Sequence, residues 1–175
     1  MARRFLLALT ALVLAIALVG CGSSEKIQIL HFNDFHAMMK PSEKAVKKDG
    51  KDVKDEKGKT VMADAGGGIA RLVKAVKDRK NDSTIVAFAG DMLQGTPFST
   101  LFQGVDGFDL MNDFVDVATI GNHEFDYGQE NLKKLLGMAK FPVICANVTG
   151  ESNVLFTSKA YIVKEIKGVK IGLFG

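Results

Sequence analysis

Three apolar runs in this chain each end abruptly in small and polar residues, and this repeated pattern constrains the fold more than any other feature. Runs of this length that are rich in β-branched and aromatic residues predict strands, and TIVAFA (residues 84–89) has the continuous apolar character of a buried parallel strand. The runs cover residues 26–32, 84–89 and 115–120, and they are followed by Asn33-Asp34-Phe35-His36, Gly90-Asp91 and Gly121-Asn122-His123-Glu124.

Helical patterns lie between these predicted strands. Apolar residues at Ile69, Leu72, Val73 and Val76 recur at positions i, i+3, i+4 and i+7, which predicts an amphipathic helix over 69–80. Helices are also predicted over 108–114 and 131–140, a fourth strand over 142–146, and two strands within 161–174 around a turn at Lys167-Gly168. Strands that alternate with helices in this way predict an α/β layered sheet.

A glycine-rich segment suggests a phosphate-binding loop and a lysine-rich segment suggests a nucleic-acid patch, but the residues favour neither interpretation. Gly66-Gly67-Gly68 lacks the Lys-Ser/Thr of a phosphate-binding P-loop, so it is interpreted as the tight start of the helix that follows. Residues 40–59 hold eight lysines among five acids and predict a solvated loop. The formal net charge is +3 for the whole chain and +1 without the first 20 residues. This near-neutral balance argues against a nucleic-acid polymer as a partner, because such binding needs a basic face.

The N-terminus carries the pattern of an export signal. Arg3 and Arg4 precede an apolar run from Phe5 to Val19, which is too short for a comfortable membrane span but suits a signal peptide. The sequence LVGC that follows resembles a bacterial lipobox, in which the Cys21 thiol is lipidated after cleavage. The prediction is a signal peptide over 1–20, a tether over 21–25 and an exported bacterial lipoprotein held on a membrane of the cell envelope by its lipid. An ordinary signal peptide whose cleavage site contains a cysteine is the alternative.

The second cysteine, Cys145, lies in the apolar run PVICANV. With Cys21 lipidated, the single remaining thiol excludes a disulfide framework. We expect Cys145 to be a buried, inert thiol and not a nucleophile.

The residues after the three runs suit a divalent metal. In open α/β sheets, sites form beyond the carboxyl ends of strands, so these side chains converge if the strands are neighbours. Carboxylate and imidazole together suit Mn, Fe, Co or Zn, Asp91 can bridge two ions, and Asn122 adds a neutral amide oxygen. Each residue also has a plainer interpretation: an exposed loop residue for His36, a helix cap for Asp91 or Asp126, hydrogen bonding for Glu124, and packing or support of a ligand for His31.

Together, the segments LHFNDFHA, GDMLQGTPFS, GNHEFDYG and CANV resemble the calcineurin-like metallophosphoesterases. The resemblance is greatest to the 5′-nucleotidase branch, which includes UDP-sugar hydrolases and 2′,3′-cyclic nucleotide phosphodiesterases. It implies that residues 26–175 form the N-terminal part of a layered, metallophosphoesterase-type β-sandwich flanked by helices.

The resemblance also implies roles for the residues. Two divalent ions (Mn, Zn, Co, Fe or Mg) are expected, one held by Asp34, His36 and a bridging Asp91, the other by Asp91 and Asn122. His123, paired with Asp126, is the expected catalytic residue. The implied reaction is hydrolysis of a nucleotide phosphomonoester or another small phosphoester.

The chain departs from the family's pattern in the features that it lacks. The family uses two further histidines, a glutamine-bearing motif and a C-terminal domain that holds the base, whereas the only histidines here are His31, His36 and His123. The expectation is therefore a fragment of a longer enzyme or a truncated product, poorly active by itself. The alternatives are a 2′,3′-cyclic nucleotide phosphodiesterase or related hydrolase, and a non-catalytic metal-binding lipoprotein. Nothing in the sequence indicates an oligomeric state.

Overall fold

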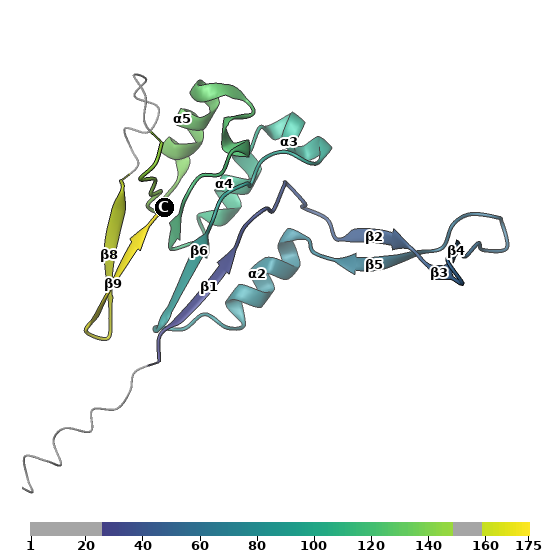
Figure 1. Cartoon of the computed structure of the whole chain (residues 1–175), viewed down its shortest axis with the longest axis horizontal. Helices are drawn as coiled ribbons and strands as arrows, with labels where there is room; N and C mark the ends of the chain where they lie inside the picture. The colour runs from purple at the N-terminus through teal and green to yellow at the C-terminus, as the bar shows by residue number, and fades with distance from the viewer. Residues whose placement is uncertain (1–25, 149–158) are drawn as a thin grey trace, which may run out of the picture.

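The computed structural model describes residues 26–148 and 159–175, so the predicted signal peptide, tether and Cys21 lie outside the described residues. The three predicted strands are neighbours in one sheet, in the order β1-β6-β7. Figure 1 shows β1 and β6 side by side. Both pairings are parallel, which confirms the arrangement expected from the apolar runs. The strands are β1 (Gln28–Phe32), β6 (Thr84–Phe88) and β7 (Val117–Ala118), and β7 is shorter than the predicted 115–120.

Helices cover one face of this sheet and form the main core with it. Leu30 and Phe32 of β1 and Val86 and Phe88 of β6 point into this core, as alternation along a strand requires. The helices are α2 (Ile69–Lys77), α3 (Pro97–Phe102), α4 (Val105–Met111) and α5 (Gly128–Met138), with the short 3₁₀ helix η1 (His123–Phe125) before α5. Helix α3 was not predicted, α2 ends three residues earlier than expected, and α4 and α5 each begin three residues earlier.

A β-hairpin covers the opposite face of the sheet. Strands β8 (Tyr161–Ile166) and β9 (Val169–Phe174) pair in antiparallel register around Lys167-Gly168, as predicted. Their inward side chains form a second, smaller core with Ile85, Val117 and Ile144 of the sheet side. The molecule is therefore layered as helices, parallel sheet and hairpin. The outer face of the hairpin leaves Tyr161 and Phe174 exposed by 65% and 83%.

The solvent exposure predicted for residues 40–59 is confirmed, but the prediction of a loop is wrong. Strands β2 (Ser42–Ala45) and β5 (Met62–Gly66) form an antiparallel ribbon, which is extended by the short strands β3 (Lys47–Lys48) and β4 (Lys51–Asp52). This ribbon projects from the body of the molecule (Figure 1). Most of its side chains are at least partly exposed on both faces, so it lacks the apolar alternation by which a strand is recognised from sequence.

The ribbon joins α2 through the triple glycine. Gly68 has a φ of +88° and directly precedes Ile69, and a side chain there would lie 2.8 Å from the backbone nitrogen of Pro41. Asp64 of β5 and Arg71 of α2 form a doubly hydrogen-bonded ion pair across this turn. The interpretation of the glycines as a tight start of a helix is confirmed.

Two further predictions need correction. His31 is exposed and not packed, because it alternates with Leu30 and Phe32 and points away from the main core at the edge of the sheet. The predicted strand over 142–146 is reduced to isolated bridges of Val143 and Ile144. Among the described residues, no helix combines the length and apolar character needed to span a membrane.

Candidate metal centre

The segments that leave β1 and β6 run side by side. Backbone N–H groups of Asp34, His36 and Ala37 donate to the carbonyl oxygens of Gly90, Asp91 and Met92 at 3.0, 3.0 and 2.8 Å. Asp34, His36 and Ala37 all have φ near +50°, a left-handed conformation that L-residues seldom adopt. This backbone course places His36 directly beside Asp91.

The segment that leaves β7 completes the group. The backbone N–H of His123 donates to Oδ1 of Asp91 at 3.0 Å. The rings of His36 and His123 meet edge to face with centroids 5.0 Å apart. One possible ligand atom from each of His36, Asp91 and His123 lies within 4.8 Å of the others, and all three residues are partly buried. Two imidazoles and a carboxylate at this spacing fit a divalent ion of the Mn, Fe, Co or Zn type.

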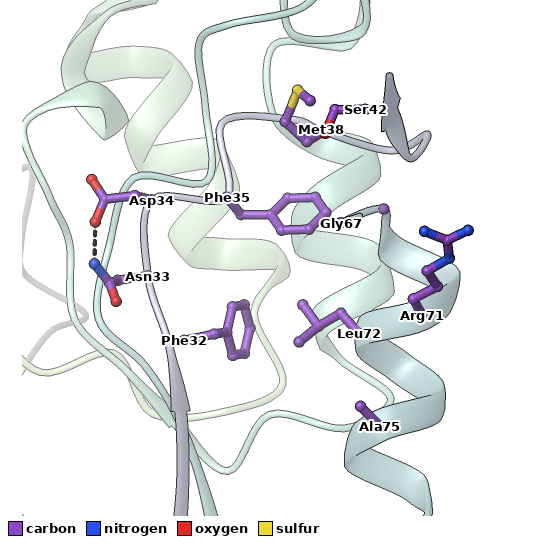
Figure 2. Close-up of a pocket in the computed structure, with 11 residues that line it drawn as sticks. Phe32, Asn33, Asp34, Phe35, Met38, Ser42, Gly67, Arg71, Leu72 and Ala75 are labelled. Atoms are coloured by element: carbon purple, nitrogen blue, oxygen red, sulfur yellow. Dashed lines mark hydrogen bonds between the residues drawn. The ribbon is translucent and has the colours of Figure 1, made fainter. Parts of the chain in front are cut away.

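The predicted ligand sets are only partly brought together. Within the described part of the chain, the group of His, Cys, Asp and Glu residues compact enough to hold an ion includes His123 and omits Asp34. Asp34 Oδ1 lies 3.6 Å from His36 Nε2, and its side chain is 57% exposed and hydrogen-bonded to the amide of Asn33 (Figure 2). Asn122 is exposed and directly precedes His123.

His123 and Asp126 form the pair that the sequence suggested. Nδ1 of His123 lies 2.8 Å from Oδ2 of Asp126, and both side chains are about one-third exposed. The hydrogen bond to Asp126 raises the pKa of His123, and the nearby Asp91 and Glu124 carboxylates act in the same direction against partial burial. The helix-cap interpretation of Asp126 is wrong, because α5 begins at Gly128 after Tyr127 and has no side-chain cap.

Glu124 is confirmed as a hydrogen-bonding residue. Its side chain is fully buried at 0% exposure. Its carboxylate accepts hydrogen bonds from the backbone N–H groups of Asp91, Met92 and Gly121 at 2.9, 2.7 and 2.6 Å. The carboxylate therefore touches both segments that lie beside the cluster.

Two glycines allow these segments to touch. A Cβ at Gly90 would lie 2.5 Å from the backbone nitrogen of Gly121, and a Cβ at Gly121 would lie 2.2 Å from Oδ1 of Asp91. Any larger residue at either position would push the segments apart. The sequence contains a signal for this close approach, since each glycine directly precedes a candidate ligand. Backbone contact between the two segments was nevertheless not predicted.

A hollow of about 500 Å³ lies between the β1 exit and the start of α2 (Figure 2). Its walls are mainly apolar, with Phe32, Phe35 and Leu72 facing the space. None of the three clustered residues lines it, and Asp34 lies at its edge. Elsewhere, Cys145 is buried with 8% exposure, as predicted.

Comparison with known proteins decides the family. A profile of the calcineurin-like phosphoesterases matches residues 27–172. The chain belongs to the calcineurin-like phosphoesterase family. The α/β fold predicted for residues 26–175 is that of this family, and the cluster of His36, Asp91 and His123 lies where its three strand ends meet.

The relatives of this calcineurin-like phosphoesterase include 5′-nucleotidases. The NAD 5′-nucleotidase of Haemophilus influenzae is 34% identical over 98% of this chain, and a probable 5′-nucleotidase of Treponema pallidum is 36% identical over 94%. The solved 5′-nucleotidase precursor of Thermus thermophilus has a TM-score of 0.66 at 28% identity and covers 85% of this chain. The chain spans 28% of the length of each of these three proteins.

Proposed function

We propose that this chain carries the metal-binding part of a hydrolase that removes phosphate from nucleotide phosphomonoesters. The convergence of His36, Asp91 and His123 at the carboxyl edge of the sheet carries this proposal. Relatives named as 5′-nucleotidases support the nucleotide as the substrate class.

Two divalent ions are part of the proposal. His36, with Asp34 and Asp91, would hold the first, and Asp91 with Asn122 would hold the second. When bound, such ions polarise a phosphoryl group and activate water for in-line displacement. Backbone hydrogen bonds between residues 34–37 and 90–92 hold the backbones of His36 and Asp91 next to each other before any ligand arrives.

His123 is the proposed catalytic residue. Its Nδ1 faces Asp126, so Nε2 is the ring nitrogen that can face a substrate. The protonated ring can stabilise a phosphoryl oxygen or donate its proton to the departing alkoxide. Asp126 keeps the ring oriented and raises the pKa of His123, so that more of it is protonated near neutral pH.

Phosphate release from AMP in the presence of Mn²⁺ tests the proposal, and it is measured on the full-length gene product because the present chain is expected to be poorly active by itself. We expect His123→Asn to lower the rate by about 10²–10⁴-fold, the usual contribution of a positioned acid or base. Full activity of this variant would remove the proposed role of His123. Wild-type protein that neither binds Mn²⁺ nor releases phosphate would refute the function. Hydrolysis of 2′,3′-cyclic AMP in preference to AMP would favour the phosphodiesterase alternative.

The N-terminal sequence supports a second part of the proposal, namely that the protein is a lipoprotein of the bacterial cell envelope. Two acyl chains hold a protein stably on a bilayer, whereas one does so only marginally. Cys21→Ser should release the protein from the membrane fraction of producing cells, and the matched Cys145→Ser variant should stay there. Wild-type protein whose intact mass shows no acyl chains would exclude lipidation.

A further inference from the structure

Glu124 occupies an unusual position for a charged side chain. It is fully buried, and it lies in η1 immediately after His123. A carboxylate removed from water in this way is costly unless hydrogen bonds replace its solvation. Its surroundings therefore have to supply those donors.

The donors come from the two segments that carry the clustered residues. Oε1 accepts from the N–H of Met92 at 2.7 Å, and Oε2 accepts from the N–H groups of Asp91 and Gly121 at 2.9 and 2.6 Å. Two of these groups belong to the exit of β6 and the third to the exit of β7. One side chain thus joins the backbones of both strand ends.

The join holds the strand ends at close contact. A Cβ added at Gly90 would lie 2.5 Å from the backbone nitrogen of Gly121, so the backbones are as near as glycine allows, and a Cβ added at Gly121 would lie 2.2 Å from Oδ1 of Asp91. The same Oδ1 accepts the His123 N–H at 3.0 Å. A small separation of the segments would therefore move the Asp91 carboxylate away from His123.

We propose that Glu124 is a positioning residue of the metal centre, whose buried carboxylate fixes the spacing of the two strand ends so that Asp91 and His123 converge with His36. The role in metal binding rests on the proposed function. The role in holding Asp91 against His123 stands on the geometry of the chain itself.

Substitution of Glu124 by glutamine removes hydrogen-bond acceptors without changing the size of the side chain. Glu124→Gln keeps the shape of the side chain but replaces one oxygen by an NH₂ group, which is a donor only. In either amide orientation, the NH₂ group would face at least one backbone N–H. The best orientation keeps the pair of bonds from Asp91 and Gly121 and loses the one from Met92. A buried donor without an acceptor then forces the segments to shift.

Asp116→Asn is the matched control. Asp116 is also a carboxylate that accepts a backbone N–H within the sheet, that of Val86 at 2.8 Å, and it pairs with Lys80 at 2.9 Å. It lies at the amino end of β7, away from the cluster. The Asp116→Asn variant should lose hydrogen bonding comparable to that lost in Glu124→Gln, but its metal centre should stay intact.

The experiment compares the full-length wild-type chain with both variants by Mn²⁺ calorimetry and by amide hydrogen exchange without metal. Glu124→Gln should weaken Mn²⁺ binding by about 10–100-fold, as is typical when a residue that supports a ligand is lost. It should also speed exchange of the His123 amide, which Glu124 does not touch. Asp116→Asn should change neither quantity.

Each result bears on a different claim. Unchanged His123 exchange in folded Glu124→Gln would overturn the positioning role, whatever the metal does. Faster exchange with Mn²⁺ affinity within about threefold of wild type would limit Glu124 to backbone structure and overturn its role at the metal centre. If wild type binds no Mn²⁺, the proposed function fails, while the exchange comparison still decides whether Glu124 holds Asp91 against His123. Should Glu124→Gln not fold, Glu124→Asp keeps the charge on a shorter side chain and is expected to show the same two effects.

Discussion

Replacement of Gly121 by alanine tests most directly whether the strand ends are in backbone contact. Gly121 does not have a positive φ, so alanine is strained there by contacts alone. The new Cβ would lie 2.2 Å from Oδ1, 2.7 Å from Cγ and 2.9 Å from the nitrogen of Asp91, whereas ordinary contact begins at 3.4 Å. The Asp91 carboxylate must therefore move by about 1 Å, and the backbone nitrogen of Asp91 by about 0.5 Å.

The expected cost follows from this displacement. Overpacking of a well-packed site typically costs about 1–3 kcal/mol in the free energy of unfolding. The displaced Asp91 carboxylate also loses its hydrogen bond from His123. A misplacement of about 1 Å can reduce catalysis about 10²-fold, and we expect a similar loss of Mn²⁺ affinity.

Gly137→Ala provides the matched control. Gly137 lies in α5, also without a positive φ, and a Cβ there meets nothing within 4 Å. Alanine in a helix is favoured over glycine by about 0.5–1 kcal/mol, so this variant should be stabilised. Urea denaturation followed by circular dichroism, with Mn²⁺ calorimetry, measures both proteins. A Gly121→Ala chain as stable as wild type, with unchanged Mn²⁺ affinity, would show that the strand ends are not in contact.

Three further predictions concern charge and packing. Asp126→Asn should lower the pKa of His123 toward about 6.5, as measured from the NMR resonances of its ring. Because folding raises the pKa of His123, the His123–Asp126 pair stabilises the fold fully below the pKa of the unfolded state, and this stabilisation is lost as pH rises through the pKa of the folded state. Arg71→Ala should return the pKa of Asp64 from about 2 toward 3.8 in a carboxyl NMR titration, because the hydrogen bond from Arg71 is what lowers it. In the wild type, the pair stabilises the fold above pH 3.8 and loses that effect as pH falls toward about 2. Leu132→Ala should lower the free energy of unfolding in urea by about 2–5 kcal/mol, because Leu132 is fully buried in the main core.

The sheet edge that carries the site was predictable because it depends on patterns that tertiary contacts rarely override. Each buried parallel strand shows a continuous apolar run, and the carboxyl ends of neighbouring parallel strands meet at one edge. His36, Asp91 and His123 could be placed there from sequence alone. The direction of the Asp34 side chain could not, because it depends on a left-handed backbone conformation that no residue type in NDFH requires.

The missed elements share a different cause. The ribbon of β2 and β5 is stabilised by pairing between its own strands and by the ion pair of Asp64 and Arg71, and neither leaves a periodic apolar pattern. Helix α3 is a short segment that begins at Pro97, with Ser99 as its buried residue and Leu101 exposed, so its amphipathic signal is weak. In both cases the structure depends on partners that are distant in sequence or on capping geometry, which composition does not reveal.

The meeting of three strand ends also has a consequence for how the chain folds. His36 and His123 are far apart in sequence, yet their rings lie 5.0 Å apart. His36 and Asp91 also come from different strand ends, so an ion held by these two residues would act as a reversible cross-link, closing a long loop whose closure costs entropy in the unfolded chain. The affinity for metal would then include part of the free energy of folding, so removal of the ion by a chelator would lower the stability of the whole sheet, including the hairpin on its far face.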